Sequence, residues 1–160
     1  MRVHAVTALL TTTAALTLTA CSGDGSGMSR ADYVRKGNAV CADQRRAVDA
    51  IETPNVDVQS NDLTRAQLAE VAAFFDAGVR IQHATVAKLR ALGYPKGDRA
   101  TLTKIYDQAD HGADSIQQAA NAARAGDLAR MRSALDKGTT DLDAAQHAVN
   151  AYGLDKCGSA

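Results

Sequence analysis

Apolar residues recur at alternating steps of three and four positions along most of this chain, and that spacing predicts amphipathic helices. Three breaks interrupt it: a polar connection over residues 52–61, a segment with two glycines and a proline at 93–97, and the pair Gly126 and Asp127. We therefore expect four helices, at about residues 30–51, 62–92, 99–124 and 128–152. The expected fold over residues 29–160 is all-α, an antiparallel up-down-up-down four-helix bundle.

The first twenty residues have the features of a secretory signal that ends at Cys21. Arg2 precedes a short apolar stretch, and residues 18–21, Leu-Thr-Ala-Cys, are typical of a bacterial lipoprotein cleavage site. The Cys21 thiol would carry a diacylglycerol, and the Gly- and Ser-rich residues 21–28 would form a flexible tether. The expected location is the outer face of the cell membrane, with the lipid on Cys21 as the anchor.

Two other interpretations of this N-terminus stay open. Residues 3–20 approach the length of a membrane span, but they include six threonines, whereas a stable span needs about 20 predominantly apolar residues. Translation from Met28 would remove the signal and leave a cytoplasmic chain.

The charge pattern disfavours two kinds of partner. The sequence holds 18 basic and 18 acidic side chains without a long block of either sign, which argues against nucleic acid and against electrostatic binding to anionic lipid. With no Trp, four Tyr and two Phe, the chain also has too few aromatic rings to stack on sugars or bases.

Cys41 and Cys157 are the remaining cysteines, and in an exported protein they would form a disulfide. Cys41 lies roughly 16 Å along the first helix, and a tail that turns at Gly153 covers a similar distance, roughly 16 Å, so the bundle topology allows the bridge. Two separate buried thiols are the alternative. Neither cysteine has a second Cys or a His at ligand spacing, so we expect no metal.

Four segments resemble small exported lipoproteins of actinobacteria. They are the cleavage site at 18–21, residues 31–41 with Cys41, residues 89–92 before Pro95, and residues 152–158. The resemblance implies an extracytoplasmic location, a helical fold and the disulfide. It implies no catalytic activity.

Histidine and nucleophile patterns indicate no enzyme. Asp107 with His111, and Asp143 with His147, are spaced as solvated pairs that support helices, and the glutamates that a di-iron bundle needs are missing from the pattern. No hydrolase, redox or phosphate-binding motif is present either, so we expect no cofactor.

Interior glycines suggest where a site could lie. In an antiparallel bundle Gly78, Gly112 and Gly138 fall near one level, beside Gln44 of the first helix and one turn from Gln82. This layer is either a waist where helix backbones touch, which we favour, or a pocket in which Gln44 and Gln82 orient a small ligand. The expected apolar walls of such a pocket are Leu68, Phe75, Ile105, Ile116 and Leu135.

The second helix also carries Phe74 and Ile81 beside its main stripe. With Val56 and Val58 of the polar connection they could form a patch for a partner protein, or the connection could fold over them. The expected function is a lipid-anchored, non-catalytic interaction or accessory module of the cell envelope, with an envelope protein as partner. The alternative is a carrier or sensor of a small apolar ligand held between the helices.

Overall fold

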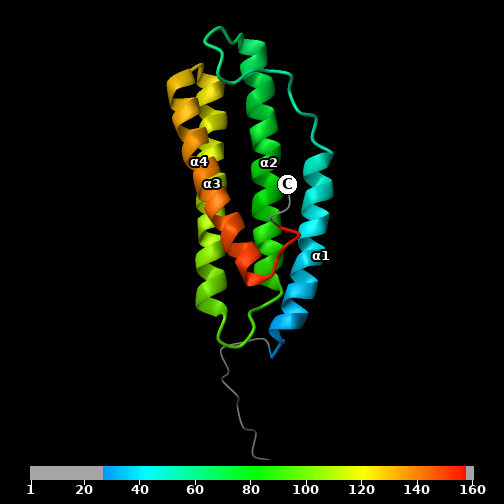
Figure 1. Cartoon of the computed structure of the whole chain (residues 1–160). Coiled ribbons are helices and arrows are strands. Elements are labelled where there is room, and N and C mark those ends of the chain that lie inside the picture. Colours follow the sequence, from blue (N-terminus) through cyan, green and yellow to red (C-terminus); the bar gives the residue numbers. More distant parts are fainter. Residues whose placement is uncertain (1–26, 158–160) are drawn as a thin grey trace, which may run out of the picture.

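The computed structural model describes residues 27–157; the expected signal peptide and the Cys21 anchor lie outside the described residues. It contains four helices, α1 (Arg30–Asp49), α2 (Arg65–Ala91), α3 (Arg99–Ala125) and α4 (Leu128–Tyr152), and no strand within the described part (Figure 1). The all-α four-helix fold is therefore confirmed.

Local capping explains most of the helix ends. Ser29 accepts a hydrogen bond from the Asp32 amide, as an N-cap does, and Gly126 and Gly153 end α3 and α4 in the left-handed conformation. Helix α2 begins at Arg65 rather than near residue 62, because Thr64 and Gln67 cap each other reciprocally.

Asp98 precedes α3 and is a residue type that often caps helices, but it does not cap this one. Its side chain makes no capping hydrogen bond. The carboxylate instead accepts a hydrogen bond of 2.6 Å from the Tyr152 hydroxyl, which links the start of α3 to the end of α4.

Consecutive helices pack side by side, whereas α1 and α4 touch only where the start of α1 meets the end of α4. There the Tyr33 and Tyr152 rings pack edge to face, and Arg30 donates to the Tyr152 carbonyl oxygen at 3.1 Å. Figure 1 shows α1 on one side of α2, with α3 and α4 on the other, and the C-terminal tail crossing from α4 to α1. Leu154 of this tail is fully buried and fills the space above Gly37 of α1. Beyond the contact of Tyr33 with Tyr152 the bundle is thus open along the α1–α4 seam, and the tail substitutes for a direct helix contact.

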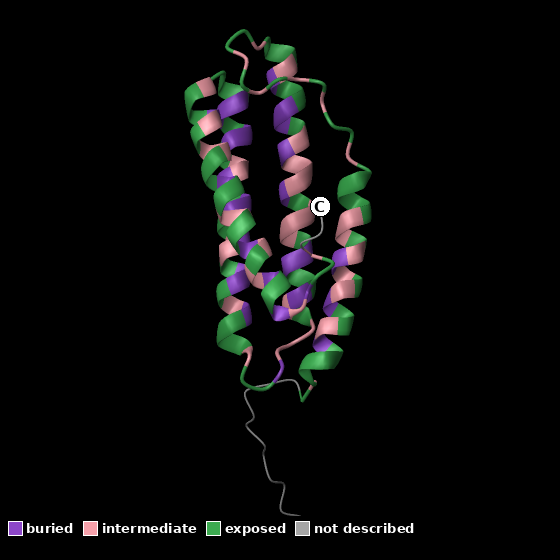
Figure 2. Ribbon diagram, in the orientation of Figure 1, coloured by how far each residue is buried: buried purple, intermediate pink, exposed green. Residues whose placement is uncertain are grey.

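Two apolar cores lie along the bundle (Figure 2). The core beside the start of α1 contains Tyr33, Leu102, Tyr106 and Leu154, and all four helices contribute to it. The other core is built from α2, α3 and α4 alone, with Met131 at its centre.

The connection between α1 and α2 covers this second core. Val56, Val58 and Leu63 pack against it, together with Phe74. Val56, Val58 and Phe74 are therefore partly buried and do not form an exposed patch, which favours the alternative in which the connection folds over this part of α2. Ile81 is half-buried and lies outside both cores.

Arg132 of α4 holds this connection in place. Its guanidinium donates to the carbonyl oxygens of Val58, Gln59 and Ser60 and to the Asn61 side chain, at 3.1, 2.8, 2.5 and 3.0 Å. One side chain therefore satisfies four acceptors of a segment that has no helix or strand of its own.

Candidate functional site

A pocket of about 220 Å³ lies between the four helices and the tail, and three glutamines line it. Gln44 Nε2 of α1 donates a hydrogen bond of 2.8 Å to Gln82 Oε1 of α2. Gln146 of α4 also lines the pocket. The structure thus brings together the two glutamines that the sequence singled out, and adds a third.

The walls of the pocket differ from the expected ones. Its apolar lining includes Val86, Leu89 and Val149 of the core beside the start of α1, together with Leu142. None of the five expected wall residues lines it. Leu68 and Phe75 belong to the other core, and Ile116 and Leu135 pack against that core. Ile105 belongs to the core beside the start of α1 but lines a separate surface hollow.

The three glycines do not line this pocket either. A Cβ on Gly138 would lie 2.6 Å from Ile116 Cδ1 and 3.0 Å from the Gly112 carbonyl oxygen, so α3 and α4 touch there. Nothing lies within 4 Å of a Cβ on Gly78. The waist is real between α3 and α4, but α2 takes no part in it.

A second groove of about 410 Å³ adjoins the pocket and shares Gln44, Gln146 and Cys157 with it. Its remaining lining residues come from α1 and the tail, and include Arg45, Val48, Asp49 and Lys156. Both hollows lie in the open seam, where α1 and α4 do not pack together.

The tail forms the floor of the seam. The Cys41 and Cys157 sulfurs lie at disulfide distance, with Cα atoms 4.7 Å apart, within the range that a disulfide needs. Asn38 of α1 donates to the Gly153 carbonyl oxygen at 3.2 Å and accepts from the Lys156 amide at 3.0 Å. The tail therefore runs along α1, as the spacing of the cysteines required.

Asn38 was missed by the sequence analysis. An asparagine inside a helix has no local signature for a partner more than 100 residues away.

The cluster formed by Tyr33, Tyr106 and Tyr152 was missed for the same reason. The hydroxyls of Tyr33 and Tyr106 are hydrogen-bonded to each other, and Tyr33 also donates to the Leu89 carbonyl oxygen at 3.4 Å.

The pocket's polar groups are neutral. Its lining includes no Asp, Glu, Lys, Arg or His, and Cys157 is disulfide-bonded. Burial raises the pKa of the Tyr106 hydroxyl, and its hydrogen bond with Tyr33 raises it further, so Tyr106 stays protonated at neutral pH. The three glutamines supply amide donors and acceptors, which suit a neutral polar group on a ligand.

The expected Asp–His pairs do not form. Asp107 pairs with Arg90 of α2 at 2.8 Å instead of with His111. Neither Asp143 nor His147 takes part in an ion pair that the described structure contains. For Asp107 the reason is that Arg90 of the neighbouring helix reaches the carboxylate, which a helical spacing rule assigns to a histidine of its own helix.

His83 is the histidine that does pair with carboxylates. Its Nδ1 lies 3.0 Å from Asp110 and its Nε2 lies 3.5 Å from Asp114. Asp110 is also bound by Arg90 at 2.7 Å. Within residues 27–157, no group of three or more His, Cys, Asp or Glu side chains is placed to hold a metal ion.

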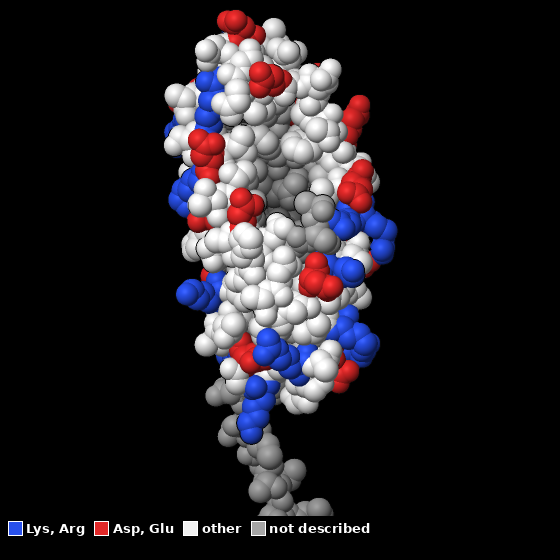
Figure 3. Space-filling view, viewed as in Figure 1, with Lys and Arg blue, Asp and Glu red and all other residues white. Residues whose placement is uncertain are grey.

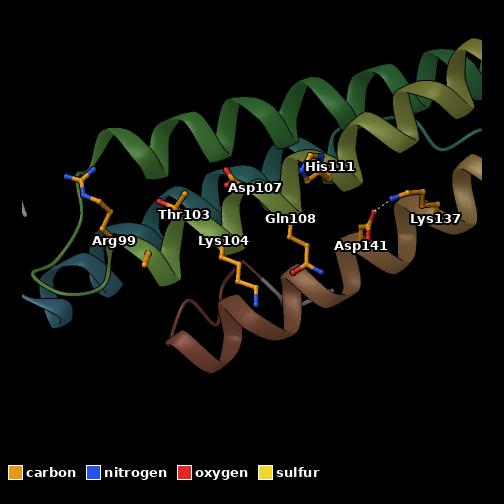
Figure 4. A pocket seen from close by; sticks show the side chains of 9 residues that line it. Arg99, Thr103, Lys104, Asp107, Gln108, His111, Lys137 and Asp141 are labelled. Atoms are coloured by element: carbon orange, nitrogen blue, oxygen red, sulfur yellow. Dashed lines mark hydrogen bonds and ion pairs between the residues drawn. The ribbon is translucent and has the colours of Figure 1, made fainter. Parts of the chain in front are cut away.

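A wider hollow of about 740 Å³ lies on the outside of α3 and α4 (Figure 4). Its charged groups are largely paired: Lys137 binds Asp141 at 2.5 Å, and Asp107 binds Arg90. Lys104 and Gln108 project from α3 and also line this hollow, as Figure 4 shows. These are long side chains at the surface, and they form no enclosed site.

The fold and the seam define a disulfide-closed four-helix bundle with a glutamine-lined pocket. No protein-family model, curated protein or solved structure matches the chain. None of the helices in the described part is both long and apolar enough to cross a membrane.

Proposed function

We propose that this chain is a lipid-anchored lipoprotein on the outer face of the cell membrane, where it acts without catalysis as an interaction or accessory module of the envelope. The observation that carries the proposal is the Leu-Thr-Ala-Cys run at 18–21, which follows an apolar stretch and precedes a Gly- and Ser-rich tether. The described fold begins directly after this tether, at α1 (Arg30–Asp49).

The disulfide supports an extracytoplasmic location. Disulfides persist in oxidising compartments and are rare in the cytosol. Translation from Met28 would leave the Cys41–Cys157 pair in a reducing compartment, where its contribution to stability would be lost.

The chemistry of the seam supports a non-catalytic role. General acid–base catalysis needs a group whose pKa lies near the working pH. The pocket offers three amides, the Thr85 hydroxyl and a tyrosine whose pKa burial raises, and the Thr85 hydroxyl already donates to the Ile81 carbonyl oxygen at 2.8 Å. Such groups bind and orient a partner, but they do not transfer protons near neutral pH.

Metabolic labelling tests the anchor. An actinobacterial host expressing the full chain and fed an alkyne-bearing fatty acid should yield a labelled protein in the membrane fraction. Cys21→Ser should abolish the label, whereas Cys41→Ser combined with Cys157→Ser should retain it. Label that persists in Cys21→Ser, or an unlabelled wild type in the soluble fraction, would contradict the proposal.

A second function, carriage of a small ligand, is favoured by the glutamine pocket. The volume of about 220 Å³ lies below the range of roughly 300–1,000 Å³ typical of ligand sites, but the adjoining groove extends it along the seam. The ligand would be largely apolar, with one neutral polar group that hydrogen-bonds to Gln44, Gln82 or Gln146.

Native mass spectrometry tests this second function. The mature chain with Cys21→Ser, exported from an actinobacterial host, should retain extra mass that leaves on unfolding. Gln82→Leu should reduce the bound fraction, and Gln118→Leu, an exposed change on α3, should not. A bare protein in every sample would leave the interaction module as the proposed function.

A further inference from the structure

We infer that the end of the bundle nearest the tether is a docking surface for an anionic lipid bilayer, which holds the anchored domain upright. The inference rests on the proposed lipid anchor. We define the basic end as the side chains of Arg30, Arg35, Lys36, Lys88, Lys96 and Arg99.

Three separate segments bring these charges together. The Tyr33 hydroxyl donates to the Leu89 carbonyl oxygen, so the start of α1 is level with the end of α2. The α2–α3 connection carries Lys96, and Arg99 lies over the Tyr94 ring at 4.8 Å. All six side chains of the basic end are exposed.

Few carboxylates neutralise this end. Of the two acidic residues in segments 28–36 and 88–100, Asp32 pairs with Arg35 at 3.2 Å and Asp98 accepts from Tyr152. The tail beside α1 adds Asp155, which lies 4.0 Å from Lys156. Lys36, Lys88 and Lys96 form no ion pair with any described residue. On the face drawn in Figure 3, Lys and Arg gather at this end of the molecule.

The opposite end of the bundle has the other sign. Residues 49–76 hold six acidic side chains and one basic one, Arg65, and residues 124–136 of the α3–α4 turn hold two acidic and three basic ones. Acidic side chains therefore outnumber basic ones at this end by eight to four. Figure 3 shows Asp and Glu prevailing at that end of the same face. The charge is therefore separated along the bundle axis, although the whole sequence is balanced.

The tether places the positive pole at the membrane. Seven residue steps separate Cys21 from Met28, so the chain spans at most about 25 Å between the lipid and the fold. The basic side chains lie within roughly 10 Å of the end of the bundle, which is comparable to the Debye length of about 8 Å at physiological salt. An anionic surface at that end therefore attracts them and repels the acidic pole.

The sequence, which has no long block of one charge sign, argued against electrostatic binding to anionic lipid, and the basic end revises that expectation. The basic residues are scattered over residues 30–36 and 88–99, so no block of one sign is visible along the chain. Only the antiparallel fold gathers them. Each Lys or Arg near an anionic membrane surface strengthens binding roughly fivefold.

Vesicle cosedimentation of the mature chain, residues 21–160 with Cys21→Ser, tests the surface without the lipid anchor. The chain retains every residue of the described fold. It should bind vesicles with 30% phosphatidylglycerol, bind neutral phosphatidylcholine vesicles far more weakly, and detach as salt rises from 50 to 500 mM. The Debye length shortens over this range of salt, so binding that depends on surface charge should weaken.

Matched variants separate the basic end from net charge. Lys36→Gln, Lys88→Gln and Lys96→Gln together should lower the vesicle partition constant by roughly a hundredfold, since each surface charge contributes about fivefold. Arg65→Gln, Arg80→Gln and Arg130→Gln remove the same charge from exposed sites elsewhere, and should lower it less than about threefold. Thermal unfolding of both variants checks that each is folded.

Equal losses in the two variants, or equal binding to neutral and anionic vesicles, would overturn the inference. Binding to an anionic cell-wall polymer in preference to vesicles would also overturn it, because the partner would then be a polymer. The fatty-acid labelling described above is independent of these readouts. If the protein took up no fatty-acid label but still bound anionic vesicles, the proposed lipid anchor would be wrong and the docking surface would stand.

Discussion

Leu154 shows how much one tail residue contributes to this fold. It is fully buried, it packs against Gly37 at the open seam, and it follows the glycine that ends α4. The apolar spacing of the helices predicts none of this, because Leu154 lies beyond the last helix. The close approach of Gly37 has the same origin, since a Cβ there would lie 2.5 Å from Leu154 Cδ2.

We expect Leu154→Ala to destabilise the protein by about 2–5 kcal/mol, the usual range for a large-to-small core change. Val48→Ala is the control, because Val48 is 44% exposed and its truncation should cost about 0.5 kcal/mol or less. Urea unfolding monitored by circular dichroism measures both. Similar midpoints for the two variants would show that the tail does not support the core.

Replacing two of the interior glycines by alanine should change stability in opposite directions. Gly138→Ala should destabilise by about 1–3 kcal/mol, because its Cβ would press on Ile116 and on the α3 backbone. Gly78→Ala should stabilise by up to about 1 kcal/mol, since the site is open and Ala is the better helix former. Thermal unfolding of the two variants gives the signs. Stabilisation by Gly138→Ala would mean that α3 and α4 can move apart freely.

At the scale of elements, α1 is the helix whose position depends most on other parts of the chain. It packs on α2 and touches α4 only through Tyr33 and Arg30 at one end, and the second core does without it. The tail, the Asn38 hydrogen bonds and the disulfide hold the remaining side of α1. The expected helices were right in number and nearly right in length, because periodicity and caps are local. The open seam depends on how helices of unequal length pack.

Removing the disulfide should therefore loosen α1 more than the rest of the bundle. Cys157→Ser should lower the free energy of unfolding by about 4–5 kcal/mol, as expected for a bridge between residues 116 positions apart on the chain-entropy account. Hydrogen exchange should rise first in α1. Uniform acceleration across all four helices would contradict a local role for the bridge.

At the scale of the whole molecule, the core beside the start of α1 holds three buried tyrosines. Burial is the main cause that raises the pKa of Tyr33, Tyr106 and Tyr152 above the ordinary value of 10.0. Below pH 10 these hydroxyls are protonated in both folded and unfolded chains. Above it the unfolded chain ionises first, so stability is lost as pH rises.

We therefore expect alkaline unfolding in which tyrosine ionisation and loss of helix occur together, above pH 10.0. Absorbance at about 295 nm and far-ultraviolet circular dichroism, recorded on one titration, measure the two events. Ionisation of all four tyrosines at the ordinary pKa with the helical signal intact would contradict the buried cluster.

The tertiary structure shows the pairing of Cys41 with Cys157, which the sequence only allowed, and the sequence by itself determined the four helices, their order and their antiparallel course. These follow from periodicity, breaks and chain length, which are properties of neighbouring residues. The tertiary structure decided the open seam, the walls of the glutamine pocket, the Arg132 contacts and the basic end. Each of these joins side chains from distant segments, and such meetings depend on helix packing rather than on any local pattern.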